Sequence, residues 1–325
     1  MTRSAPLALV LCLCSPAAAA LDGTWRSSSQ MIGPDRVHLD VSFAGTQNTG
    51  TTFAMDALAG LSADQVHATT ETPVRFTLDR EAGRVEFEGS FRAAKGKGRF
   101  TFVGKPEYFE SLRKLGIEDS APGRRDGSES IDERLLAFTL LDLSTDYIRS
   151  MLAEGYRESL DQYLALRIFD VTPEHTRAMQ ELGSRKPTAD ELVASRVHGV
   201  TPDFVREMHE AGWDLSFDEL VQARIHGVTP ELCKEMAQLG YHLSFEELTA
   251  FRIHGVTPDW IAELRELGYE HLDAGELVST RIFGVTAEFI RKVGAAGYGY
   301  LPMSELISMR IQGIDADDLA RRREM

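Results

Sequence analysis

A seven-residue motif, Arg-Ile-His-Gly-Val-Thr-Pro with close variants, returns six times in this chain of 325 residues. The copies lie 28 or 29 residues apart, and their arginines are Arg167, Arg196, Arg224, Arg252, Arg281 and Arg310. A period of this size is typical of stacked supersecondary units, none of which can bury its apolar face alone. The motif therefore predicts an array of repeats in the C-terminal part of the chain.

Each repeat carries the signals of two short helices. The first begins at an N-cap residue eight positions before the arginine, with Gln or Glu three residues later, at Ser159, Thr188, Ser216, Ser244 and Asp273. It ends at a glycine such as Gly199. The second begins at Thr-Pro-acid, as in Thr201-Pro202-Asp203, and ends at a glycine followed by an aromatic residue, as in Gly240-Tyr241. We expect that aromatic ring to fill the gap between repeats.

The apolar residues of each helix form one stripe, which in one first helix consists of Phe217, Leu220, Val221, Ile225 and Val228. Each stripe is too short to be buried within one hairpin, so the neighbouring repeat must cover it. We expect the isoleucine after each arginine to belong to this core. The prediction for residues 131–325 is an α-solenoid of helical hairpins, each about 28–29 residues long.

The segment 21–104 has a different period. Apolar and polar residues alternate, as in Val37, Leu39, Val41 and Phe43, and Gly-bearing connections separate the runs. This pattern predicts a small antiparallel β sandwich or barrel, since one flat sheet cannot hide its apolar face. Residues 105–117 resemble a second repeat helix and are expected to join the two parts, and 118–130 read as a flexible loop. The fold class is α+β, in several domains.

Residues 1–20 have the features of a signal peptide: Arg3, a short apolar run and small residues up to Ala20. They predict an exported bacterial protein, periplasmic or extracellular, with no membrane span in the rest of the chain. Lipid attachment at Cys12 or Cys14 stays open, although the preceding leucines disfavour it. A net charge of −15 argues against nucleic acid as a partner.

The repeated arginines have two interpretations. As a structural ladder, each guanidinium would bind C-terminal helix carbonyls or pair with a carboxylate of the Thr-Pro-acid motif, such as Asp203 or Glu231. As a functional feature, they would form a row of anion-binding groups on an open face. The acidic composition favours the ladder.

No pattern in the sequence indicates catalysis, a cofactor or a metal. His198, His226 and His254 recur at one repeat position, but neighbouring helices lie about 10 Å apart, too far to share an ion. Phe169 and Phe283 occupy the same position in other repeats, which favours packing. Cys233 reads as a small buried hydrophobe. We expect no enzyme, and no cofactor.

The repeat, with its Glu-Leu/Met-x-x-Leu/Ala-Gly-Tyr/Trp continuation, resembles units found in bacterial exported proteins. Some of these units are appended to membrane antirepressor-type peptidases of the BlaR1-like M56 family. The resemblance covers about 105–312, and the zinc motif and membrane helices of the peptidase are missing from this sequence. It implies a bacterial envelope setting and a sensing or binding role.

The favoured function is a non-enzymatic scaffold that binds an envelope protein or peptide on its repeat surface. Second-helix positions that vary between repeats are the candidate binding residues: His175, Arg206, Lys234 and Ala262. Two alternatives remain. One is an envelope hydrolase with a site in the β domain or where it joins the solenoid, and the other is a purely structural spacer.

Overall fold

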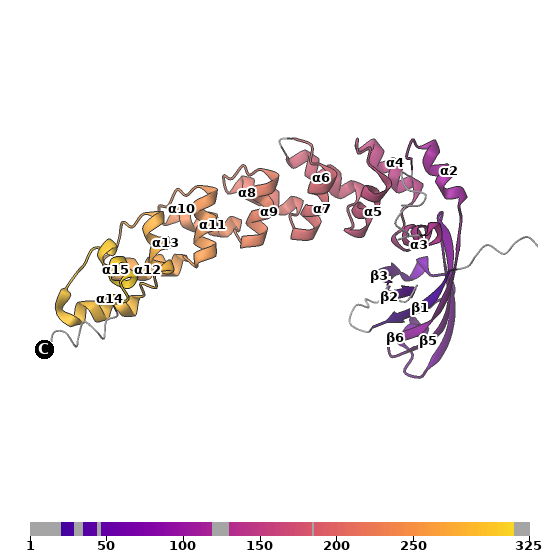
Figure 1. The fold of residues 1–325 in the computed structure, drawn as a ribbon, viewed down its shortest axis with the longest axis horizontal. Helices are drawn as coiled ribbons and strands as arrows, with labels where there is room; N and C mark the ends of the chain where they lie inside the picture. The colour runs from indigo at the N-terminus through magenta and orange to yellow at the C-terminus, as the bar shows by residue number, and fades with distance from the viewer. Residues whose placement is uncertain (1–20, 29–34, 44–46, 119–129, 184, 315–325) are drawn as a thin grey trace, which may run out of the picture. The chain divides into compact units, whose positions relative to one another are not determined.

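The computed structural model describes residues 21–28, 35–43, 47–118, 130–183 and 185–314 (Figure 1). The chain divides into two compact units, Met1–Pro173 and Glu174–Met325. The predicted signal peptide and nearly all of the predicted loop lie outside the described residues. No helix in the described ranges combines the length and apolar composition needed to cross a membrane.

The first unit contains a six-stranded antiparallel sheet that curls as a half-barrel (Figure 1). In space the strand order is β3-β2-β1-β6-β5-β4, so the first strand pairs with the last. The strands are β1 Leu21–Ser27, β2 Arg36–Phe43, β3 Gln47–Ala54, β4 Thr72–Asp79, β5 Gly83–Arg92 and β6 Lys95–Gly104. The α+β class is therefore observed, but with one open curled sheet where we expected a sandwich or barrel.

Trp25 is the centre of the sheet core, with 1% of its surface exposed. Its indole lies against glycines of the neighbouring strands: a Cβ atom at Gly98 would be 2.5 Å from the indole nitrogen, and one at Gly96 would be 2.7 Å from the ring. The indole N–H donates to the carbonyl of Glu88 at 3.3 Å. These strand glycines are thus required for close approach of the ring to the backbone.

Helices, rather than a second sheet, cover the apolar face. Helix α1 (Ala63–His67) contacts β4 and β5, and α3 (Ile131–Leu141) contacts β5 and β6. The turn between β4 and β5 adds polar links, because Arg80 pairs with Asp142 at 2.5 Å and Glu81 accepts from the backbone N–H of Thr145 at 3.0 Å. The sheet is therefore covered in part by α3 and the residues after it, which lie beyond the last strand and which alternation within strands could not reveal.

The remaining helices of the first unit are α2 (Glu107–Lys114), α4 (Thr145–Ala153) and α5 (Leu160–Ile168), with a short η2 turn at Met55–Ala57. Helix α2 falls within the joining helix predicted at 105–117. Its Tyr108 is buried, and the Tyr108 hydroxyl donates to the carbonyl of Leu143. This bond fixes α2 against the start of the repeats.

The second unit is built from alternating short helices, beginning with α6 (Pro173–Leu182). The first helices of successive repeats contact one another, α7 with α9, α9 with α11, α11 with α13 and α13 with α15. The other elements are α7 Ala189–His198, α8 Pro202–Glu210, α9 Phe217–His226, α10 Pro230–Gln238, α11 Phe245–His254, α12 Pro258–Glu266, α13 Ala274–Ile282, α14 Ala287–Val293, a π-helical turn η3 Gly294–Tyr298 and α15 Met303–Ile311. This is a helical repeat-like architecture.

The predicted helix caps form as expected. Reciprocal capping boxes occur at Thr188, Ser216, Ser244 and Asp273, and the Ser159 hydroxyl accepts from the backbone N–H of Gln162. Gly199, Gly227 and Gly255 end their helices in the left-handed conformation. Local side-chain chemistry therefore sets both ends of these helices.

One core prediction is wrong. Ile225 is 55% exposed, whereas Ala223, on the other side of Arg224, is fully buried. The same holds around Arg167, Arg196, Arg252 and Arg281, where the residue before the arginine is buried and the residue after it is exposed. The predicted core isoleucine is thus a surface residue.

Candidate functional site

The most regular surface feature of the second unit is a set of exposed aliphatic side chains, here called the aliphatic row. Its members each follow the repeat arginine and are 51–60% exposed: Val197, Ile225, Ile253, Ile282 and Ile311. They lie on α7, α9, α11, α13 and α15, which contact one another in that order. Equivalent positions on such helices face the same side, so the side chains form one row. In the first unit, Ile168 holds the same position.

Half-buried apolar or small residues extend the row along α7, α13 and α15. Val193 and Ala194 lie four and three positions before Val197, and thus on the same helical face. Val278 and Ser279 have the same relation to Ile282. A repeated apolar surface of this kind is typical of an interaction site.

Carboxylates border the aliphatic row at one end. Seven positions before the row residues, and so two turns towards the helix N-terminus, stand the exposed Asp190, Asp218 and Glu246. Their negative charge favours a partner that places basic groups beside its apolar ones.

The repeat arginines reach back to the preceding repeat. Arg167, Arg252 and Arg310 donate from Nε to the carbonyls of Leu141, His226 and Phe283, at 3.0, 3.4 and 3.4 Å. Each acceptor lies at the C-terminal end of a first helix, where carbonyls lack intrahelical partners. This is the geometry that the ladder interpretation requires.

Aromatic rings hold several of the same guanidinium groups from another side. The distances from Cζ to the ring centroid are 4.8 Å for Arg167 over Tyr147, 4.9 Å for Arg224 over Phe204, 5.3 Å for Arg281 over Trp260 and 5.1 Å for Arg310 over Phe289. Such cation–π contacts are worth about 0.5–1 kcal/mol at exposed sites. These arginines therefore link consecutive repeats, and Arg196 stands at the equivalent exposed position of α7.

The four candidate residues of the second helices do not share one environment. Arg206, Lys234 and Ala262 each lie five positions after the helix-capping threonine and are exposed, with Arg206 paired to Asp203 at 2.8 Å. His175 lies three positions after Thr172 and is half-buried. Its Nε2 is 2.8 Å from the Ser195 hydroxyl, as Trp260 Nε1 is 3.0 Å from the Thr280 hydroxyl three repeats later. His175 thus occupies a packing position between repeats.

The histidines of the motif do not gather. His198 and His254 are exposed and His226 is half-buried, and no group of three or more His, Cys, Asp or Glu side chains in the described part of the chain could hold a metal ion. Cys233 is buried, and burial raises the pKa of its thiol to about 11. The thiol is therefore protonated at neutral pH and is a poor nucleophile.

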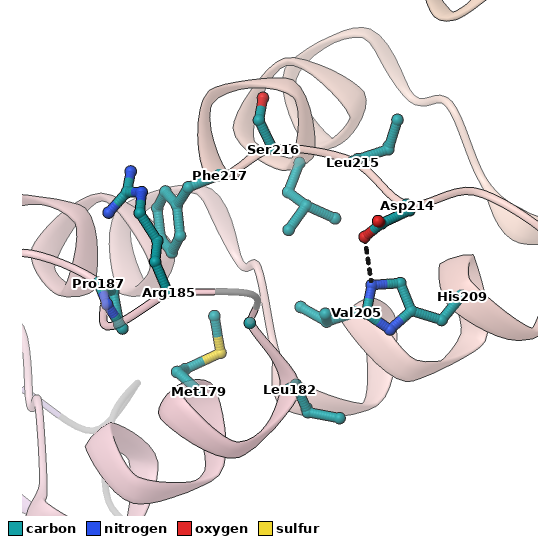
Figure 2. A pocket seen from close by; sticks show the side chains of 12 residues that line it. Met179, Leu182, Arg185, Pro187, Val205, His209, Asp214, Leu215, Ser216 and Phe217 are labelled. Carbon is teal, nitrogen blue, oxygen red and sulfur yellow. Dashed lines mark ion pairs between the residues drawn. The ribbon is translucent and has the colours of Figure 1, made fainter.

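A pocket of about 100 Å³ opens between α6, α8 and α9 (Figure 2). Its apolar walls come from Met179, Leu182, Val205, Phe217 and Leu220. At its rim, the imidazole of His209 is 3.5 Å from the carboxylate of Asp214, and Arg185 pairs with Glu191. The volume is well above the roughly 10–15 Å³ that one water molecule needs. An apolar group with a polar end fits such a site.

The exposed face of the sheet carries a second, shallower hollow of about 570 Å³. Charged side chains line it and pair across it, as Arg75 and Glu88 do at 3.0 Å, while the Asp22 carboxylate accepts from the Thr101 hydroxyl at 3.0 Å. Paired, solvated charges of this kind are ordinary on the outer face of a sheet.

Comparison with protein-family models gives no match, and comparison with curated proteins gives none either. The class that fold and surface define is thus a β sheet followed by helical repeats that expose an aliphatic row. Sequence reasoning missed this row, because the isoleucine belongs to the same helical stripe as the buried leucine. The residue on the other side of the arginine gives no uniform signal, since it is Ala223 in α9 but Phe251 in α11.

Proposed function

We propose that this chain is an exported, non-enzymatic binding protein whose helical repeats form a solenoid and bind a protein or peptide in the bacterial envelope. The observation that carries the proposal is the aliphatic row, five equivalent side chains that are each more than half exposed. Burying the exposed half of one such side chain contributes about 1 kcal/mol, so several together supply a substantial part of the free energy of association.

The contacts of the repeat arginines indicate that these residues position the row and do not themselves bind the partner. Their guanidinium groups contact carbonyls and rings of the preceding repeat, which holds the first helices in fixed register. A fixed register places the row residues before the partner is bound, and this lowers the entropic cost of association. The arginines are therefore positioning residues in this proposal.

The chemistry of the partner follows from the surface. The row selects apolar side chains, and the bordering Asp190, Asp218 and Glu246 select basic residues next to them. Export rests on the signal-peptide pattern of residues 1–20. A sensing role in the envelope is in line with the resemblance of the repeats to those of antirepressor-type peptidases.

The test compares two triple variants in the native bacterium. Ile225→Gln, Ile253→Gln and Ile282→Gln remove the row, while Arg206→Gln, Lys234→Gln and Ala262→Gln alter an equally exposed part of the second helices. We expect a stoichiometric complex, measured by cross-linking and light scattering of the purified protein, to be lost in the first variant and kept in the second. A complex that survives in the first variant would place the binding surface elsewhere, and a cell that functions normally without the complex would favour the spacer.

A further inference from the structure

The second helices differ in the residue that follows their terminal glycine. It is aromatic in the other repeats of the second unit, as Trp213, Tyr241, Tyr269 and Tyr298, but after Gly183 the sequence has Ser184. The hydroxyl of Tyr241 donates to the carbonyl of Leu272 at 3.0 Å, and that of Tyr269 to the carbonyl of Leu301 at 2.7 Å. Leu272 directly precedes the N-cap of α13, and Leu301 directly precedes the N-cap of α15. In each case one other first helix lies between the tyrosine and this N-cap along the chain.

The counterpart of these acceptors for position 184 is Leu215. It precedes the N-cap Ser216 as Leu272 precedes the N-cap Asp273, and it lies 31 residues after position 184, the same separation as between Tyr241 and Leu272. No hydrogen bond to the Leu215 carbonyl forms among the described residues. The acceptor is thus in place without a tyrosine from the chain.

The pocket of Figure 2 lies at this position, because Leu182, Gly183 and Leu215 line it. The equivalent depression near α12 is lined by Leu239, Gly240 and Leu272, and there Tyr241 forms part of the wall. Arg265 lies over the Tyr241 ring at 5.8 Å and donates to the Leu239 carbonyl at 2.7 Å. His209 and Arg265 are equivalent positions, because each lies eight residues after the capping threonine of its helix. His209 stands at the rim of the pocket and pairs with Asp214.

We propose that this pocket binds a tyrosine side chain of the partner, in the place that the chain's own tyrosines fill in other repeats. The ring would pack on Met179, Leu182 and Val205, and its hydroxyl would donate to the Leu215 carbonyl. The proposal rests on the binding function proposed above and identifies one residue of the partner. It uses a different surface from the aliphatic row, so the two can fail separately.

The probe is p-cresol, the side chain of tyrosine, with toluene as the control that lacks the hydroxyl. Protein labelled with ¹³C in the methionine methyl groups reports binding through Met179, whose signal is assigned with Met179→Leu. We expect p-cresol to shift this signal in the full-length protein and to bind about 2–10-fold more tightly than toluene, the value of one net hydrogen bond. No shift at millimolar p-cresol, or equal binding of toluene, would overturn the proposal.

The matched variant is Ser184→Tyr, which restores the repeat pattern. We expect it to raise the midpoint of thermal unfolding and to abolish the p-cresol shift, because the added ring fills the pocket. Val205→Phe narrows the same pocket from another wall, so a failure of Ser184→Tyr to fold leaves the test intact. A shift that persists in both variants would place the bound ring elsewhere.

Blocked peptides separate a tyrosine residue from a free phenol. We expect acetyl-Ala-Tyr-Ala-amide to compete with p-cresol and acetyl-Ala-Phe-Ala-amide to compete several-fold more weakly. Binding of p-cresol without competition by the tyrosine peptide would indicate a small phenolic ligand and contradict the assignment to a partner's tyrosine. If the row variant lost the native complex but still bound p-cresol, both surfaces would be shown to act. If the protein failed to bind p-cresol but kept its row-dependent complex, only the pocket proposal would fall.

Discussion

The sheet and the repeats are stabilised over different distances along the chain. Trp25 packs on Gly96 and Gly98 and donates to Glu88, so its partners lie more than sixty positions away. In the repeats, Arg252 binds His226 and Tyr241 binds Leu272, about one period away. The sheet therefore depends on contacts that all form together, whereas each repeat depends on its neighbours. A destabilising substitution should therefore weaken all strands of the sheet, whereas in the repeats it should weaken only the neighbouring helices.

The largest expected effect is that of Trp25→Ala. The ring is 1% exposed and lies edge-on to Phe76 at 5.5 Å between centroids, so its removal leaves a large cavity. We expect a loss of about 3–5 kcal/mol in the free energy of unfolding, in the range for a buried tryptophan. Hydrogen exchange should become faster in all six strands, measured by mass spectrometry.

Arg99→Ala is the control, since Arg99 lies on the exposed face of β6 one residue after Gly98. It should change stability by less than about 0.5 kcal/mol. If Trp25→Ala accelerated exchange in β1 alone, the sheet would not be the single cooperative element described here.

The same difference in distance explains what the sequence could predict. Helix caps depend on residues three positions apart, and the boxes at Ser216 and Ser244 form as predicted. The closure of the sheet depends on α3, and no pattern within 21–104 reports that helix. Helical periodicity places Ile225 on the apolar stripe of α9 but does not show how far the buried part of that stripe extends. The neighbouring helix sets that limit, so the prediction of a core isoleucine is wrong. The pocket lies in the repeat whose sequence departs from the glycine–aromatic pattern, at Gly183-Ser184.

Leu248→Ala tests whether a cavity in the repeats stays local. Leu248 is fully buried in α11, and the loss should be roughly 3 kcal/mol, within the 2–5 kcal/mol range for such a change. In contrast to the sheet, faster hydrogen exchange should appear in α9, α11 and α13, because α11 contacts both neighbours. Equal acceleration in α7 and α15 would show that the repeats unfold as one unit.

Arg281→Met probes a single link between repeats. The stem is retained, but the guanidinium no longer lies over Trp260 at 5.3 Å, and we expect a loss of about 1–2 kcal/mol from the cation–π contact and its charge. Arg281→Lys should recover part of this loss, since an ammonium group keeps the charge without the planar stack. Thermal unfolding followed by circular dichroism measures both. A methionine variant as stable as the parent would contradict the ladder interpretation.

The smallest effect concerns a contact inside one helix. The Ser244 hydroxyl accepts from the backbone N–H of Glu247 at 3.2 Å, and the Glu247 carboxylate accepts from the Ser244 N–H at 2.8 Å. Ser244→Ala removes the first bond and should cost about 1 kcal/mol, while Ser244→Thr keeps the acceptor and should cost less. Amide exchange should rise in the first turn of α11 before any other segment. If exchange rose equally in α13, the cap would act through packing between repeats. Even the ends of a repeat helix would then depend on contacts with the neighbouring repeat rather than on residues three positions apart.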